Sequence, residues 1–191
     1  MVKILPFPEY IYADKYEAKE YNLKVINFLK DYKKINKSII KSNRGGYQTA
    51  DIVDENICLP IVNITIDMIK KNLKFKKERE VKIILNNLWI NENYKECYNI
   101  PHYHPNSNFS GVFYIKTPKE CGNLIFIKEG GSYMNCLDSF LDGDIGNKYY
   151  TIEPQENLLI LFPSNFLHFA EPNKSEESRI SIAFNVSMSH G

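Results

Sequence analysis

The N-terminal part of the chain carries apolar residues at spacings of three and four. Across Tyr16–Ile35 this spacing places an apolar stripe along one side of a helix and leaves lysines on the others. The same spacing returns from about Leu59 to Phe75, where Pro60 suits the first turn of a helix. We therefore predict two helices, separated by a break at Ser42–Gly46 whose adjacent glycines permit a turn.

After about Glu80 the pattern changes to short apolar runs rich in β-branched and aromatic residues. Turn-forming residues such as Pro118, Gly122 and Pro163 separate these runs. The predicted strands are Val81–Ile90, Ser110–Ile115, Asn123–Ile127, Tyr149–Glu153, Leu158–Phe162 and Ile180–Val186. Short strands at regular spacing predict a mainly β barrel or sandwich, with the N-terminal helices packed against it.

The length and composition fit one folded domain. Of the 191 residues, 43% are hydrophobic, which is enough for a sizeable core. We expect a single domain over residues 1–191, with a helical part at 1–80 and the β core at 81–191. Lysine and arginine together number 24 against 23 acidic residues. This near-zero net charge gives no reason to expect nucleic acid or an anionic membrane as a partner.

The sequence has no run of about 18 apolar residues, so we predict no membrane span. The first residues lack the charged-then-apolar layout of a signal peptide, which favours a cytoplasmic location. None of the four cysteines stands in a C-x-x-C spacing, and we expect reduced, mostly buried thiols.

Three of the four histidines fall where strong apolar segments end. His102 and His104 stand in Ile100-Pro-His-Tyr-His-Pro105, and His168 follows the strand at Leu158–Phe162. In an extended segment, residues two apart point to the same side, so the H-x-H pair presents two imidazoles together. A third histidine from a later strand completes a facial set of metal ligands and leaves positions open for substrate and oxygen. A structural role is the alternative for each histidine taken alone.

Arginine is rare in this lysine-rich chain, and Arg179 begins the last predicted strand. One face of that strand carries Arg179, Ser181, Ala183 and Asn185, while the other face is wholly apolar and predicts core. Arg179 and Ser181 form an R-x-S pair that can hold a carboxylate, through a bidentate guanidinium and a hydroxyl donor. The alternative is an edge strand with a solvent-exposed face and a surface ion pair.

The order of these motifs resembles the 2-oxoglutarate- and Fe(II)-dependent oxygenases, most of all their prolyl-hydroxylase-like branch and a group of bacterial and phage proteins. The resemblance runs from about residue 40 to the end. The combined set of motifs is specific, whereas no single motif would be. The matching segments are Ser42-Asn-Arg-Gly-Gly-Tyr-Gln48, Trp89-Ile-Asn91, His102-Tyr-His104-Pro105, Ser110-Gly-Val-Phe-Tyr114, Phe162-Pro-Ser164, His168, Pro172-Asn173 and Arg179-Ile-Ser-Ile-Ala-Phe-Asn185.

The resemblance implies a double-stranded β-helix, a jelly-roll or cupin-like barrel, with Fe(II) at one mouth. It implies His102 and His168 as iron ligands. The implied contacts to the co-substrate 2-oxoglutarate are Tyr114, Arg179, Ser181 and Asn185, with a core aromatic role as the alternative for Tyr114. The implied activity is that of a dioxygenase that uses O2 to hydroxylate a substrate and releases succinate and CO2. The substrate, a small molecule or a peptide, is not readable.

One position departs from the family pattern, because most of these enzymes have Asp or Glu where His104 stands. We expect His104 to be an iron ligand, since H-x-H-P is the pattern of the narrower group. Otherwise water or another anion fills that position, or a carboxylate from the loop Lys128–Lys148, where Asp138, Asp142 and Asp144 lie. That loop and the segment Ser42–Gln48 are the expected lid and rim of the site.

Two aromatic residues, Tyr47 and Trp89, are candidates for stacking on a substrate, with packing as the alternative. Two other functions stay open from the sequence. A cupin-type metal enzyme also uses H-x-H and a later histidine, but it normally has a glutamate four or five positions on, where Asn108 and Phe109 stand. A non-catalytic binding module on the same barrel is the other alternative.

Overall fold

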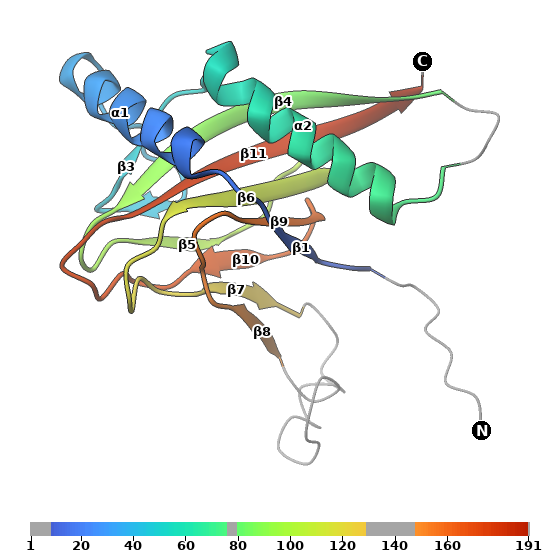
Figure 1. Cartoon of the computed structure of the whole chain (residues 1–191). Coiled ribbons are helices and arrows are strands. Elements are labelled where there is room, and N and C mark those ends of the chain that lie inside the picture. Colours follow the sequence, from blue (N-terminus) through green and yellow to red (C-terminus); the bar gives the residue numbers. More distant parts are fainter. Residues whose placement is uncertain (1–8, 76–79, 129–147, 191) are drawn as a thin grey trace.

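The computed structural model describes residues 9–75, 80–128 and 148–190. Two antiparallel sheets face each other, and both helices lie across the outer face of the larger sheet (Figure 1). The chain therefore has the mainly β, two-sheet architecture with packed N-terminal helices that the hydrophobic pattern predicts.

The larger sheet has six strands and the smaller sheet has five. In spatial order the larger sheet is β1 (Tyr12–Lys15), β9 (Leu158–Pro163), β6 (Phe109–Lys116), β11 (Arg179–His190), β4 (Val81–Asn93) and β3 (Tyr47–Gln48). The smaller sheet is β2 (Asn43–Arg44), β5 (Tyr98–His102), β10 (His168–Ala170), β7 (Leu124–Ile127) and β8 (Tyr149–Ile152). Apart from β3–β4 and β7–β8, neighbouring strands are not consecutive in the sequence, so segments far apart along the chain meet at the site.

Both predicted helices exist, and one begins earlier than expected. Helix α1 spans Lys19–Ile35, and helix α2 spans Glu55–Asn72 instead of starting near Leu59. Asp54 caps α2, because its side chain accepts a hydrogen bond from the backbone N–H of Asn56 at 2.8 Å. Pro60 consequently lies inside the helix, where its missing N–H removes one hydrogen bond.

The uninterrupted apolar run of β9 is explained by burial on both of its faces. Leu159 and Leu161 point into the core beneath the helices. Leu158, Ile160 and Phe162 pack between the two sheets with residues such as Tyr114. A strand covered on both faces needs no polar alternation, so its run reads as continuous hydrophobicity.

The described part of the first 80 residues contributes three short strands besides the helices. The segment Ser42–Gln48, predicted as a break and a rim, forms β2 and β3, which pair with β5 and β4 and so connect both sheets. Among the residues that the structure describes, no helix is both long and apolar enough to cross a bilayer. Cys58, Cys97 and Cys121 are buried free thiols, as predicted.

Candidate metal centre and active site

Three imidazoles meet at one end of the space between the sheets. β5 ends at His102 and β10 begins at His168, and the two residues are direct partners across the strand pair. His104 follows two positions after His102, and its backbone N–H donates to the carbonyl of Ser164 at 2.9 Å. One ring nitrogen from each histidine lies within 4.8 Å of the others. The pairing of distant strands thus assembles the predicted three-histidine set.

Backbone carbonyls fix the orientation of two of these rings. The Nδ1 of His102 lies 2.7 Å from the carbonyl of Ile100, and the Nδ1 of His168 lies 2.8 Å from that of Phe166. A carbonyl oxygen only accepts, so Nδ1 carries the proton and the Nε2 lone pair is left for a metal. The His104 ring is held differently, with its centroid 5.8 Å from that of Trp89.

Burial keeps the three rings neutral. It lowers the pKa of His168 to about 3, helped by the nearby charges of His102 and His104. It lowers the pKa of His104 to about 4, and His102 and Lys41 add to the effect. Burial also lowers the pKa of His102, against the opposing hydrogen bond to Ile100. Neutral imidazoles bind a transition metal such as iron without first losing a proton, so this donor set fits the metal that the resemblance implies.

An inner cavity of about 60 Å³ adjoins the histidines. Both sheets contribute to its wall, and the larger sheet supplies most of the polar groups. Its principal lining residues are Trp89, Asn91, Asn93, His102, His104, Tyr114, His168, Arg179 and Ser181. Arg179, Ser181 and Ala183 all face this space, as the alternation along the last strand predicts.

Arg179 is the charged group of the inner cavity, and it is only 3% exposed. Its Nη1 donates to the carbonyls of Cys121 and Gly122, each at 2.8 Å. Gly122 has a φ of +81°, and a Cβ there would lie 2.4 Å from the carbonyl oxygen of Glu171, so only glycine presents this carbonyl without strain. Within the described part of the chain, no carboxylate forms an ion pair with Arg179. A buried cation without an acidic partner favours an anionic ligand.

Two hydroxyl groups stand beside this guanidinium. Ser181 pairs with Tyr114 on β6 and with Asn91 on β4. Burial raises the pKa of Tyr114 to about 12, although the charge of Arg179 opposes the shift, so the phenol stays protonated and can donate. The residue Asn91 is only 8% exposed, and its buried Oδ1 has no hydrogen-bond partner among the residues that the structure describes. A polar wall with an unsatisfied hydrogen-bonding group favours a polar ligand.

An outer cavity of about 370 Å³ opens beside the inner one and shares Ser42, Trp89, His102 and His104 with it. Its other lining residues are Lys41, Gln48, Asn87, Ile100, Tyr103, Pro105 and Asn185. Asn185, predicted as a co-substrate contact, lies here and bonds to Asn87 and Ser110, apart from the wall that holds Arg179. Hollows of about 460 and 510 Å³ occur elsewhere, but no histidine lines them, so their size does not indicate the reactive site.

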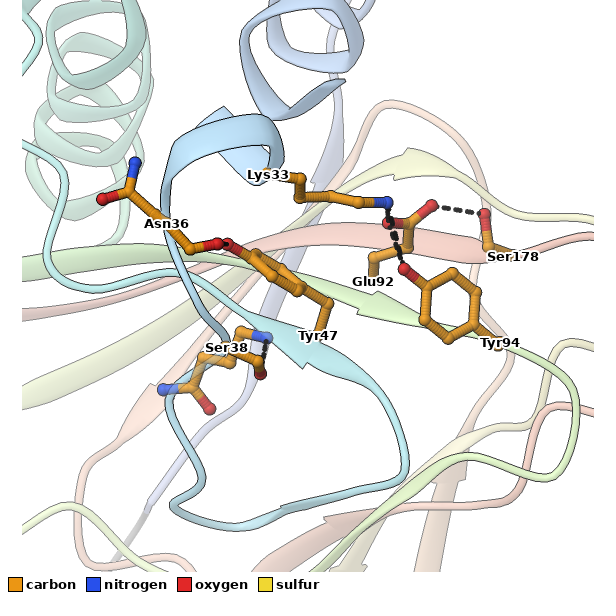
Figure 2. Close-up of polar contacts among 8 residues, drawn as sticks. Lys33, Asn36, Ser38, Tyr47, Glu92, Tyr94 and Ser178 are labelled. Atoms are coloured by element: carbon orange, nitrogen blue, oxygen red, sulfur yellow. Dashed lines mark hydrogen bonds and ion pairs between the residues drawn. The ribbon is translucent and has the colours of Figure 1, made fainter. Parts of the chain in front are cut away.

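A half-buried polar network ties helix α1 to β4, the strand with which the rim strand β3 pairs. Figure 2 shows Lys33, Glu92, Tyr94 and Ser178 joined by their polar atoms. Burial works against the charge of Lys33, but its bonds to Glu92 and Tyr94 outweigh that effect and raise its pKa.

The rim strand itself is held just beyond α1. The Tyr47 hydroxyl donates to the carbonyl of Asn36 at 2.8 Å (Figure 2), and the Gln48 backbone N–H donates to Ser38 Oγ at 3.0 Å. Tyr47 thus packs toward the helix and is absent from both cavity walls, whereas Trp89 lines both. The predicted lid at 128–148, with Asp138, Asp142 and Asp144, lies mostly outside the described residues.

The sequence analysis names Asn91 only as part of a matching segment and gives neither Asn91 nor Asn93 a place in the site, although both lie on the inner wall. The strand that was predicted to end at Ile90 continues as β4 to Asn93, and Asn91 and Asn93 line the cavity. Asparagine is depleted in strands, so the pattern predicts that this strand ends with its last apolar residue. The available signal was the alternation itself, since positions 87, 89, 91 and 93 all face the two cavities.

Comparisons with known proteins agree with this geometry. A family model described as "Putative 2OG-Fe(II) oxygenase" matches residues 87–185, just over half of the chain. No curated protein matches the chain significantly.

Solved structures similar to this one share its fold at low sequence identity. A viral collagen prolyl hydroxylase from Paramecium bursaria Chlorella virus-1, in complex with 2-oxoglutarate, is 17% identical with a TM-score of 0.56, covering 92% of this chain and 95% of that one. A Pseudomonas putida prolyl-4-hydroxylase is 12% identical with a TM-score of 0.59, covering 93% and 92%. The α-ketoglutarate-dependent epimerase SnoN from nogalamycin biosynthesis is 11% identical with a TM-score of 0.67, covering 95% and 81%.

The fold of these structures is the double-stranded β-helix, as predicted. The family match covers all three histidines and Arg179. On that match, the chain belongs to the 2OG-Fe(II) oxygenase family, whose members use Fe(II) and 2-oxoglutarate.

Proposed function

We propose that this oxygenase holds Fe(II) through His102, His104 and His168 and binds 2-oxoglutarate against Arg179. The observation that carries the proposal is a buried guanidinium with no acidic partner among the described residues, in the same cavity as three neutral imidazoles. A dicarboxylate that chelates the metal with one end can reach Arg179 with the other. Bound iron would supply the oxygen chemistry that couples decarboxylation of 2-oxoglutarate to hydroxylation of a substrate.

The chain's own residues have distinct tasks in this proposal. The carbonyls of Ile100 and Phe166 hold the protons of His102 and His168 on Nδ1 and leave Nε2 free. The guanidinium of Arg179 and the hydroxyls of Tyr114 and Ser181 can donate to the distal carboxylate of the co-substrate. Asn91 can turn its amide toward the same ligand.

The apolar residues between the sheets protect this arrangement from water. The rings of Phe162 and Phe126 lie 4.7 and 5.9 Å from that of His168, centroid to centroid. Such a shell lowers the local polarity and strengthens each polar contact inside it. The similar structures include enzymes named as prolyl hydroxylases, which makes a prolyl peptide one substrate class to test beside small molecules.

Anaerobic titration tests this proposal directly. Fe(II) followed by 2-oxoglutarate should produce a weak visible charge-transfer band that requires both components. Succinate release in air should follow the same requirement. A folded protein that gives no band and no succinate contradicts the proposal.

A further inference from the structure

The charged side chains that line the two cavities are all positive, although the whole chain is nearly neutral. The formal net charge is +1. Arg179 is the charged side chain of the inner cavity, and Lys41 is that of the outer cavity. No carboxylate belongs to the described lining of either cavity. The local field therefore favours anions even though the overall composition does not.

Lys41 is held at the mouth by its surroundings. Its Nζ lies 5.9 Å from the centroid of the Trp89 ring, which is within the range of a cation–π contact. The Nη1 of Arg44 donates to the backbone carbonyls of Lys41 and Asn43, at 3.0 and 2.9 Å. The segment that follows is paired with both sheets through β2 and β3. These contacts fix the backbone of Lys41, and its exposed ammonium group lies at the outer cavity close enough to His104 to act on its charge.

The outer cavity is also lined by fixed amide groups. The Nδ2 of Asn185 donates to the Oδ1 of Asn87 at 2.8 Å, and the Ser110 hydroxyl donates to the Oδ1 of Asn185 at 2.6 Å. These bonds orient both amides without a ligand, which reduces the entropy lost on binding. The volume of about 370 Å³ suits a small molecule or one side chain.

We propose that the substrate of this site is a small anionic molecule whose carboxylate or phosphate group is bound by Lys41. The inference rests on the proposed function for the reaction, but the binding of the anion can be measured without it. Lys41 neutralises the charged group, while Trp89 and the amides of Asn87 and Asn185 contact the remainder of the molecule beside the histidines.

The chain contains a single tryptophan, and this residue lines the cavity, so its fluorescence reports on binding there. The probes are aliphatic carboxylates and phosphate monoesters, each paired with its neutral amide or alcohol counterpart. Titrations are made with and without saturating 2-oxoglutarate, which separates binding at Lys41 from binding at Arg179. We expect the anions to change the emission of Trp89 at lower concentration than their neutral counterparts.

Two Lys41 variants and one control sharpen the test. Lys41→Gln should weaken anion binding about fivefold at low salt, as expected for one accessible ion pair, and this loss should shrink at high salt. Lys41→Arg should retain binding. Lys24→Gln, an exposed lysine on helix α1, should change nothing.

The outcomes separate this inference from the proposed function. If neutral counterparts bind as well as anions, or if Lys41→Gln leaves anion binding unchanged, the inference is wrong. If the iron and 2-oxoglutarate band is missing while the Lys41-dependent preference for anions persists, the anion site stands and the proposed reaction does not.

Discussion

The inner cavity and its rim are built in different ways. The inner wall follows from strand pairing, since His102 and His168 are partners between β5 and β10, and Ser181 lies between Tyr114 and Asn91 in the larger sheet. The rim combines strand pairing with side-chain contacts, because β3 pairs with β4 and is also tied to the end of helix α1 through Tyr47, whose hydroxyl donates to Asn36 and whose ring lies under Lys33. The proposed reactive groups therefore lie where strand pairing alone sets their positions, whereas the segment beside them is also fastened to helix α1 by side-chain contacts.

The largest expected effect comes from removing a ligand on the inner wall. His168→Ala should weaken Fe(II) affinity more than about 100-fold, because loss of a group that merely orients a ligand already costs 10–100-fold. The affinity can be measured by anaerobic competition with a chromogenic chelator. Circular dichroism should show an intact fold, and unchanged affinity in a folded variant would remove His168 from the site.

The next largest effect concerns Arg179, the proposed clamp for the distal carboxylate of 2-oxoglutarate. Arg179→Leu should weaken 2-oxoglutarate binding at least about 30-fold, since truncating one partner of a buried charged contact costs 2–5 kcal/mol. Arg179→Lys should recover only part of the loss, because lysine lacks the planar fork. Fe(II) binding without 2-oxoglutarate serves as the control. Equal loss of both affinities would indicate a general disruption instead of a clamp.

Acid should destabilise the metal-free protein through the same three histidines. Their pKa values are lowered on folding, to about 3 for His168 and about 4 for His104. Between these values and about 6.5, the unfolded chain binds more protons than the folded chain, so the free energy of unfolding rises with pH in this window and falls on acidification. We expect a loss of at least about 2 kcal/mol between pH 6.5 and 4, measured by urea unfolding with chelator present. If the free energy of unfolding of His168→Gln depends less steeply on pH, His168 accounts for part of the loss. An identical pH dependence would contradict a contribution from His168.

The smallest effect is expected at the rim. Glu92→Gln should lower the free energy of unfolding by about 1–3 kcal/mol, because it leaves Lys33 without a charged partner in a half-buried network. Its effect on Fe(II) affinity should be slight, since the inner wall does not depend on this network. Asp31→Asn breaks the exposed pair with Lys34 and should have no measurable effect, which makes it the matched control. Equal stability of the two variants would contradict the structural role of the rim network.

The groups on the inner wall that could be predicted are those marked by a spacing or alternation within one short segment of the sequence. The H-x-H spacing, the alternation from Arg179 to Asn185 and the apolar run of β9 each identify a face by local periodicity. The resemblance to oxygenases joined these separate pieces, and the family match confirms it.

The rest depends on contacts between distant segments. Nothing near Lys33 indicates that it will pair with Glu92, 59 positions away. The strands β2 and β3 are two residues each and exist only because β5 and β4 offer edges to them. The start of α2 at Glu55, with Asp54 as its cap, was readable in principle, but Pro60 favoured a predicted boundary near Leu59. The cytoplasmic location and the identity of the contacts to 2-oxoglutarate stay predictions.

The central claim is that His104 is the third metal ligand, where most of these enzymes have a carboxylate. The most direct test is the Fe(II) affinity of His104→Ala and His104→Asp beside the unaltered protein. The account predicts that the alanine variant loses at least about tenfold in affinity, as expected when one coordinating group is removed, while aspartate largely preserves it. An alanine variant with unchanged Fe(II) affinity would contradict the account and leave a two-histidine centre.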